Sequence, residues 1–393
     1  MPSAAARRAY QGPALFSFGF RPFFMGAATW AAVAVPVWIW AYSDGGAMTV
    51  DRDWHVHEML FGYLGGVAAG FLLTAVPNWT GRLPVAGAPL AGLYALWVAG
   101  RIAMLLAPGF PVSAAVVDAA FLVTFAVVVW REVLAGRNWR NAPVCLLVTL
   151  LAAANLAFHA RLVWPEAGPP AERAALAAMA MLIALIGGRI TPSFTRNWMA
   201  QNHMTPLPAP FGALDRAALA ACVAALGAWI AAPQHPASGA LLVLAGAGVL
   251  ARLARWRGAL TLPEPLVWSL HAGYAWLGAA LVLIGASILA PGAVPRTAGL
   301  HALTAGAAGV MTLAVMTRAT LGHTGRARRA DDLTMAVYLA VNAAAGLRVA
   351  APFAGPGQTM LLIAAAVMWT CAFAGFLWGY APMLVRGRLA AGG

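Results

Sequence analysis

Apolar stretches of about 20 residues recur along the whole chain, separated by short segments rich in proline, glycine and arginine. Because a helix needs ~20 residues to cross the hydrocarbon core of a bilayer, each stretch predicts a transmembrane helix. The predicted spans are 24–42, 57–77, 88–107, 111–130, 143–164, 174–192, 213–232, 239–256, 266–289, 297–317, 333–353 and 360–383. We therefore expect an all-α, polytopic membrane protein with twelve transmembrane helices in a single domain, residues 1–393.

Most of the charges lie between these stretches. The formal net charge of +13 comes from arginine alone, because the chain contains no lysine. Placing the amino terminus inside puts most arginines on the cytoplasmic side, beginning with Arg7 and Arg8, whereas the first outer loop carries Asp44, Asp51 and Asp53. This asymmetry predicts that both termini are cytoplasmic, and it indicates membrane orientation rather than nucleic-acid binding. The first span follows directly without an A-x-A cleavage site, so we expect no removable signal peptide.

Cysteine spacing excludes several cofactor classes. Cys145, Cys222 and Cys371 are far apart in apolar segments, without a C-x-x-C or C-x-x-C-H pattern. Zinc ribbons, thioredoxin chemistry and covalent c-type haem therefore have no support in the sequence.

Similar sequence motifs occur at the ends of the second, sixth and tenth spans, which suggests an internal repeat. The three endings are Thr74-Ala-Val-Pro-Asn-Trp-Thr-Gly-Arg82, Arg189-Ile-Thr-Pro-Ser-Phe-Thr-Arg-Asn197 and Met316-Thr-Arg-Ala-Thr-Leu-Gly-His-Thr-Gly-Arg326. An N-x5-R pattern also recurs, from Asn155 to Arg161 and from Asn342 to Arg348. A three-by-four helix repeat is one interpretation, and short chance similarity is the other.

Two histidines precede the second span. His55 and His57 would diverge by about 200° on a helix, so they serve one metal only if His55 lies in a loop; otherwise they face two sites. The glycines that follow leave few side chains on this span, at Gly62, Gly65, Gly66 and Gly70. Either a flat macrocycle or a closely packed helix would fit there.

Further histidines lie at other span ends. His301 and His159 are expected near the outer boundary, at the level of His55 and His57, where converging imidazoles would suit haem and copper. The alternative is a scatter of unrelated interfacial histidines.

Histidines are also expected nearer the cytoplasm. His271 is either a metal ligand or a hydrogen-bonded core residue, and His323 either reaches a second site or is solvated. His203 and His235 occur in proline-rich loops, and we interpret both as structural or surface residues.

Charged residues near the outer ends complete the candidate site. Arg101, Arg161 and Arg348 either bind haem propionates or snorkel to lipid headgroups. Glu58 and Asp118 are acids in the outer apolar zone, where each can orient an imidazole, relay protons or pair with an arginine.

Several motifs resemble those of the NnrS family, and the resemblance covers essentially the whole chain. They are Leu15-Phe-Ser-Phe-Gly-Phe-Arg-Pro-Phe-Phe24, Trp54-His-Val-His-Glu-Met-Leu-Phe-Gly62, Gly70-Phe-Leu-Leu-Thr-Ala-Val-Pro-Asn-Trp-Thr-Gly-Arg82, Leu321-Gly-His-Thr-Gly-Arg326 and the stretch around His301. The resemblance implies a twelve-span protein of the bacterial inner membrane that contains haem and copper and takes part in the response to nitric oxide. Four histidines match those of the family's motifs: His55, His57, His301 and His323.

The twelve spans also resemble the catalytic subunits of haem–copper oxidases and nitric oxide reductases. This chain departs from their pattern because its sixth span lacks a histidine and its tenth has one where that family has a pair. The likeness is therefore an analogy at the level of fold.

Three functional hypotheses follow. The first is a protein with haem b and copper that binds nitric oxide and reduces it with electrons from membrane quinol, Glu58 or Asp118 supplying protons. The second is a sensor or carrier of haem, copper or nitric oxide without turnover. The third is a twelve-helix secondary transporter. All three place the chain in membrane lipid, and none involves nucleic acid.

Overall fold

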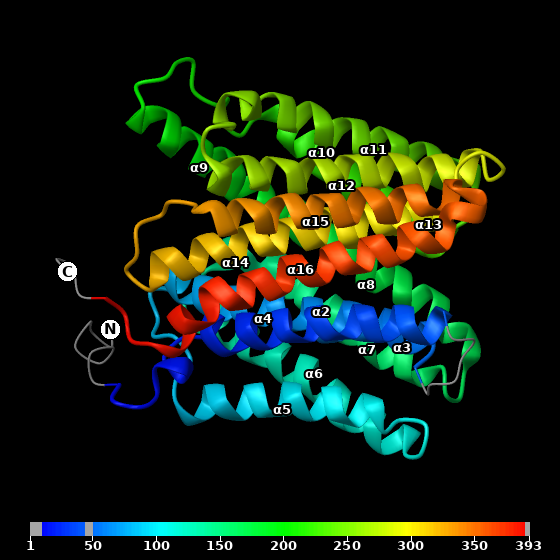
Figure 1. Ribbon diagram of the computed structural model, residues 1–393, viewed down its shortest axis with the longest axis horizontal. Helices are drawn as coiled ribbons and strands as arrows, with labels where there is room; N and C mark the ends of the chain where they lie inside the picture. The colour runs from blue at the N-terminus through cyan, green and yellow to red at the C-terminus, as the bar shows by residue number, and fades with distance from the viewer. Residues whose placement is uncertain (1–9, 44–49, 390–393) are drawn as a thin grey trace. The chain divides into compact units, whose positions relative to one another are not determined.

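The computed structural model describes residues 10–43 and 50–389 (Figure 1). The described chain is 82% helix and contains no strand. Arg7, Arg8 and Asp44, which contributed to the predicted orientation, lie outside the described residues. A helix satisfies its own backbone hydrogen bonds, which is a requirement for crossing hydrocarbon. The predicted all-α class is confirmed.

Twelve helical spans in the described chain are long and apolar enough to cross a membrane, as predicted. They are Phe20–Ser43, Arg52–Thr80, Ala88–Leu105, Pro111–Ala135, Trp139–Ala160, Pro165–Gln201, Ala213–Ala231, Pro236–Ala254, Pro265–Leu289, Arg296–His323, Asp332–Phe353 and Gly355–Val385. The protein is therefore a multi-pass membrane protein. The second span begins five residues before the predicted residue 57, and the sixth extends beyond both predicted ends.

The helices that build these spans are labelled in Figure 1. They are α2 (Phe20–Ser43), α3 (Arg52–His57), α4 (Leu64–Thr80), α5 (Ala88–Leu105), α6 (Pro111–Ala135), α7 (Ala142–Ala160), α8 (Gly168–Leu182), α9 (Gly188–Gln201), α10 (Ala213–Ala231), α11 (Pro236–Ala254), α12 (Pro265–Leu289), α13 (Arg296–His301), α14 (Val310–His323), α15 (Asp332–Ala350) and α16 (Gln358–Val385).

Three spans are interrupted by π-helical segments. Glu58–Tyr63 separates α3 from α4, Ile183–Gly187 separates α8 from α9, and Ala302–Gly309 separates α13 from α14. These are the second, sixth and tenth spans, whose endings share related wording. π-helical turns are uncommon and often accompany functional sites. Their recurrence every fourth span supports the interpretation of a helix repeat.

The chain forms two compact units, and neither is continuous in sequence. Unit 1 takes the described residues of Met1–Ala175, Arg318–Ala327 and Phe376–Gly393, and unit 2 takes Leu176–Thr317 and Arg328–Gly375. Because the chain passes between the units more than once, they are not consecutive domains.

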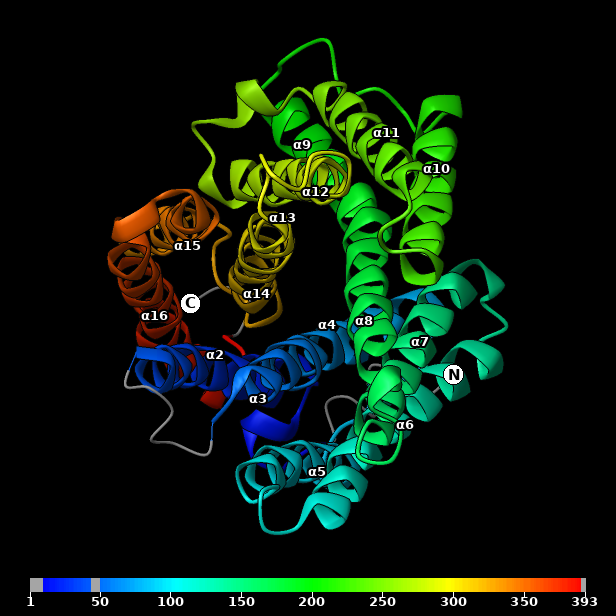
Figure 2. The same cartoon turned by 90° about the vertical axis from the view of Figure 1, so that its right-hand side faces the viewer.

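Glycines allow helices α11 and α12 of unit 2 to approach closely (Figure 2). A Cβ on Gly246 would lie 2.7 Å from the carbonyl oxygen of Gly278, and a Cβ on Gly285 would lie 2.5 Å from that of Gly239. Such close contact replaces the hydrophobic driving force that is absent between helices in lipid.

We expect Gly246→Ala to lower the stability of the protein, because its Cβ would overlap backbone that cannot move independently. Overpacking of this kind costs about 1–3 kcal/mol. Gly227→Ala in α10 is the matched control, since its Cβ would meet no atom within 4 Å. Thermal unfolding in detergent measures both; equal midpoints for the two variants would contradict the close contact.

Candidate functional site

The site begins with the start of helix α3. The Asp51 carboxylate accepts a hydrogen bond from the backbone N–H of Trp54 at 2.7 Å, which caps the helix. This cap explains why the span begins at Arg52 rather than at residue 57: the polar residues before the apolar run belong to the helix. His55 and His57 are consequently both helical.

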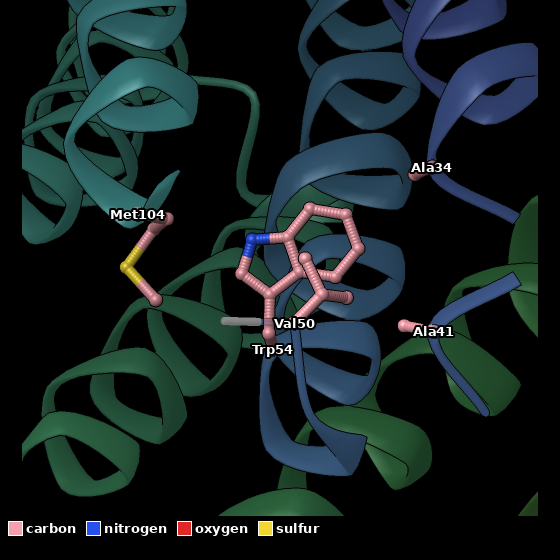
Figure 3. Packing of buried hydrophobic residues seen from close by; sticks show 5 residues of the cluster. All are labelled: Ala34, Ala41, Val50, Trp54 and Met104. Carbon is pink, nitrogen blue, oxygen red and sulfur yellow. The ribbon is translucent and has the colours of Figure 1, made fainter. Parts of the chain in front are cut away.

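A cluster of buried apolar side chains holds α3 in unit 1. The Trp54 indole lies between Met104 of α5 on one side and Ala34 and Ala41 of α2 on the other, beside Val50 (Figure 3). Trp54 is only 6% exposed. Because His57 follows one turn later, this packing sets the depth at which its imidazole enters the unit.

The two motif histidines face different surroundings. The His55 ring stacks on Trp38 with the centroids 5.1 Å apart and the planes 12° apart. The His57 ring lies 5.0 Å from that of His159 on α7. This is the divergence expected of two residues two positions apart on a helix, so His55 and His57 do not serve one site.

His57 belongs to a closed ring of ion pairs. Its Nδ1 lies 2.9 Å from Oε1 of Glu58, and its Nε2 lies 3.0 Å from Oδ2 of Asp118. Arg101 donates from Nη1 to Oε2 of Glu58 at 2.6 Å, and from Nη2 to Oδ1 of Asp118. Each of the four side chains thereby contacts two others, and all are at most 3% exposed.

Helix α7 adds two polar groups to the ring. Asn155 donates from Nδ2 to Oδ2 of Asp118 at 2.8 Å and holds its Oδ1 3.2 Å from Nε2 of His57. His159, four residues later on the same helical face, places Nε2 2.9 Å from the same Asp118 oxygen. Asp118 therefore joins α3, α5 and α7 through its carboxylate.

Two glycines make room for these contacts. A Cβ on Gly62 would lie 2.2 Å from Nη1 of Arg101, and one on Gly100 would lie 3.1 Å from Oδ1 of Asp118. The neighbouring Gly66 and Gly70 pack against Trp97 and Phe24. The glycines thus receive side chains of adjacent helices, as in the helix-packing alternative.

The ring holds one proton by charge balance. Glu58 and Asp118 carry two negative charges when ionised, and Arg101 carries one positive charge. Ionised carboxylates only accept hydrogen bonds, so His57 donates from both nitrogens as an imidazolium, or a carboxyl keeps the proton. A buried cluster with an unbalanced charge would be costly in a membrane.

One group in the described chain has the composition of a metal site. The ligand atoms of His57, Asp118 and His159 lie within 4.8 Å of one another. Two imidazole nitrogens and one carboxylate oxygen suit first-row transition metals, copper included. The outer contacts of Glu58 and Asn155 would orient the ligands, as such partners do in metal proteins.

A charged edge adjoins this cluster. Arg161 pairs with Asp53 and lies 4.0 Å from the centroid of the Phe158 ring. Arg52 pairs with Glu172 at 2.7 Å. Arg101 and Arg161, predicted as partners of haem propionates, thus contact carboxylates of the protein itself.

The remaining predicted residues lie elsewhere. In unit 2, Nε2 of His271 lies 2.8 Å from Oγ1 of Thr195, Nδ1 of His301 donates to the carbonyl oxygen of Thr297 at 2.8 Å, and Arg348 lies in the last turn of α15. In unit 1, His323 lies 5.4 Å from the Phe20 ring. Neither His271 nor His323 joins the cluster.

Asn155 is the site residue that the sequence did not single out. It appeared only as the start of an N-x5-R pattern. A better signal was available, because a lone asparagine one helical turn before His159 in an apolar span needs a polar partner.

Comparison with known proteins decides the family. No curated protein matches the chain. The sequence model described as NnrS protein matches residues 14–388. The chain belongs to the NnrS family. This confirms the resemblance drawn from the motifs and identifies a membrane protein of the nitric oxide response. The NnrS match includes every residue of the ring and of its α7 extension.

In this NnrS protein, Arg101→Gln should be strongly destabilising, because Glu58 and Asp118 would remain buried with too little positive charge. Breaking a buried ion pair from one side costs on the order of 3–5 kcal/mol. Arg52→Gln removes a guanidinium that is 60% exposed and should change the unfolding free energy by about 1 kcal/mol or less. Thermal unfolding in detergent would show a large shift for the first variant alone; similar shifts for both would refute the closed ring.

Proposed function

We propose that this protein removes nitric oxide by reducing it at a metal site formed by His57, Asp118 and His159. We place it in the bacterial inner membrane, with both termini in the cytoplasm. The observation that carries the proposal is the convergence of these three ligand atoms within 4.8 Å, in a unit built of membrane-spanning helices. The family supplies the link to nitric oxide.

Copper fits the residues present. Imidazole nitrogen binds copper well, and a monovalent copper ion that displaces the ring proton keeps the cluster neutral. When bound, the metal would accept nitric oxide as a ligand and pass electrons to it. His57 and His159 would hold the metal, while Glu58 and Arg101 would keep the His57 ring oriented.

Haem b does not fit beside His57. Both nitrogens of that imidazole contact polar side chains, and the Phe61 and Phe158 rings lie 5.2 Å and 5.3 Å from it. His301 is better prepared as a haem ligand, because the hydrogen bond from Nδ1 to Thr297 selects the tautomer whose lone pair is on Nε2. Haem at His301 stays a prediction, and no reaction step is assigned to it.

The reaction needs protons and electrons in equal number. Two nitric oxide molecules, two electrons and two protons give one nitrous oxide and one water. Membrane quinol is the proposed donor, since its oxidation to quinone releases two electrons and two protons. Glu58 and Asp118 would hand protons to the site, because both carboxylates contact the His57 imidazole. Burial excludes bulk water from the reacting groups.

The first test is metal content. His57→Ala and His159→Ala should each weaken copper binding about tenfold or more, because even an outer partner of a metal site contributes that much. Elemental analysis after loading and washing measures the loss. His203→Ala, at an exposed loop position, is the control and should bind as the wild type does. Unchanged copper in both site variants would remove the metal assignment.

The second test is turnover. Glu58→Gln leaves Asp118 and Arg101 balanced without a proton, so nitric oxide consumption per copper bound should fall by about 10²–10⁴. Glu166→Gln, at an exposed position, should retain activity. Consumption by the reduced wild-type protein is followed with a nitric oxide electrode and quinol.

The same assay separates the rival functions. Binding that stops at one nitric oxide per metal would establish a sensor or carrier in place of an enzyme. Protein that neither retains metal nor consumes nitric oxide would favour a transporter.

A further inference from the structure

A buried guanidinium caps the end of helix α16 in unit 1. Arg21, in the first turn of α2, is 3% exposed. Its Nη1 donates to the carbonyl oxygens of Met383, Leu384 and Arg386, at 3.2, 2.8 and 2.7 Å. The last carbonyls of a helix lack partners within the helix and attract cations. This role occupies one nitrogen, while the buried Nε of Arg21 has no hydrogen-bond partner.

A second guanidinium lies within electrostatic range of the first. Arg326 follows helix α14, and its buried Nη1 also has no hydrogen-bond partner. Its positive charge acts unfavourably on that of Arg21. Residues 386–389, which follow α16 and are called the C-terminal arm, contact the segment that carries Arg326. Leu389 donates its backbone N–H to the carbonyl oxygen of Thr324 at 3.1 Å. Two like charges are therefore held together by the fold.

The described residues supply no anion to balance these charges. Within residues 10–43 and 50–389, neither Arg21 nor Arg326 forms an ion pair with a carboxylate. The arm adds further positive charge, and Arg388 packs so closely that a Cβ on Gly325 would lie 3.3 Å from its Cγ. Arg21 is buried and Arg326 is partly buried. Cations removed from water without a counter-charge are costly, which indicates a ligand of negative charge.

The position of the pair identifies the chemistry of that ligand. The start of α2 and the ends of α14 and α16 are ends of candidate membrane spans, the level at which lipid headgroups lie. Guanidinium groups bind phosphate oxygens through several N–H groups at once. We propose that Arg21 and Arg326 form an oxyanion site for a phosphate group, supplied by an anionic phospholipid. This site is separate from the ring around His57.

Thermal unfolding of the full purified chain in detergent tests the site. Phosphatidylglycerol should raise the unfolding midpoint by a few degrees more than phosphatidylcholine does. Arg326→Gln should lose most of this increment. Arg329→Gln removes the same charge from an exposed position of the same loop and should keep it. Arg326 is the chosen position because loss of Arg21 would also uncap α16 and threaten folding.

Each outcome decides the proposal. If inorganic phosphate alone reproduces the increment, the oxyanion site stands and its ligand is a free anion. The site is overturned if Arg326→Gln responds to phosphatidylglycerol as the wild type does. It is equally overturned if Arg326→Gln and Arg329→Gln lose the response together, because the lipid would then act on overall charge.

Discussion

The structure of unit 1 depends on a buried ring in which His57, Glu58, Arg101 and Asp118 each contact two neighbours. Removing four such groups from water is opposed by a large desolvation cost, and a single ion pair seldom offsets it. In a closed ring each charged side chain contacts two partners. Asn155 and His159 use the remaining acceptor capacity of Asp118. The contacts also fix the positions of α3, α5, α6 and α7 relative to one another. Stability and candidate chemistry therefore share the same atoms.

Two buried arginines of unit 1, Arg101 and Arg21, are stabilised in different ways. Arg101 is balanced by two carboxylates, whereas Arg21 donates to carbonyl oxygens at the end of α16 and lies over the Phe20 ring. The first arrangement is self-contained and sets up a local acid–base system. The Arg21 arrangement relies on the weaker field of a helix terminus, and the Nε of Arg21 remains a donor without a hydrogen-bond partner. Arginine thus belongs to an internal site at Arg101, and to the proposed oxyanion site at the end of a span at Arg21.

Much of the fold could be predicted from sequence because the bilayer imposes a simple rule of length and polarity. The twelve spans followed from that rule, and the divergence of His55 from His57 followed from helix geometry. The start of α3 was misplaced because the Asp51 cap lies among polar residues that also suit a loop. Pairing of Glu58 or Asp118 with an arginine was one of several expected roles, but that both would pair with Arg101 was not predicted, and the role of Asn155 was missed. These contacts arise where four helices meet. No local pattern records which spans are neighbours.

The π-helical segment Glu58–Tyr63 gives the ring a further dependence, on the number of residues in the span as well as on their identity. A π turn accommodates one more residue than an α turn, and each residue rotates an α-helix by about 100°. Relaxing the segment to an ordinary helix by deleting one residue would turn His57 relative to α4 by roughly that angle. The imidazole would then lose its contact with Asp118, although the sequence would still contain every residue of the site. For this family, insertions and deletions within the second span are as informative about function as substitutions.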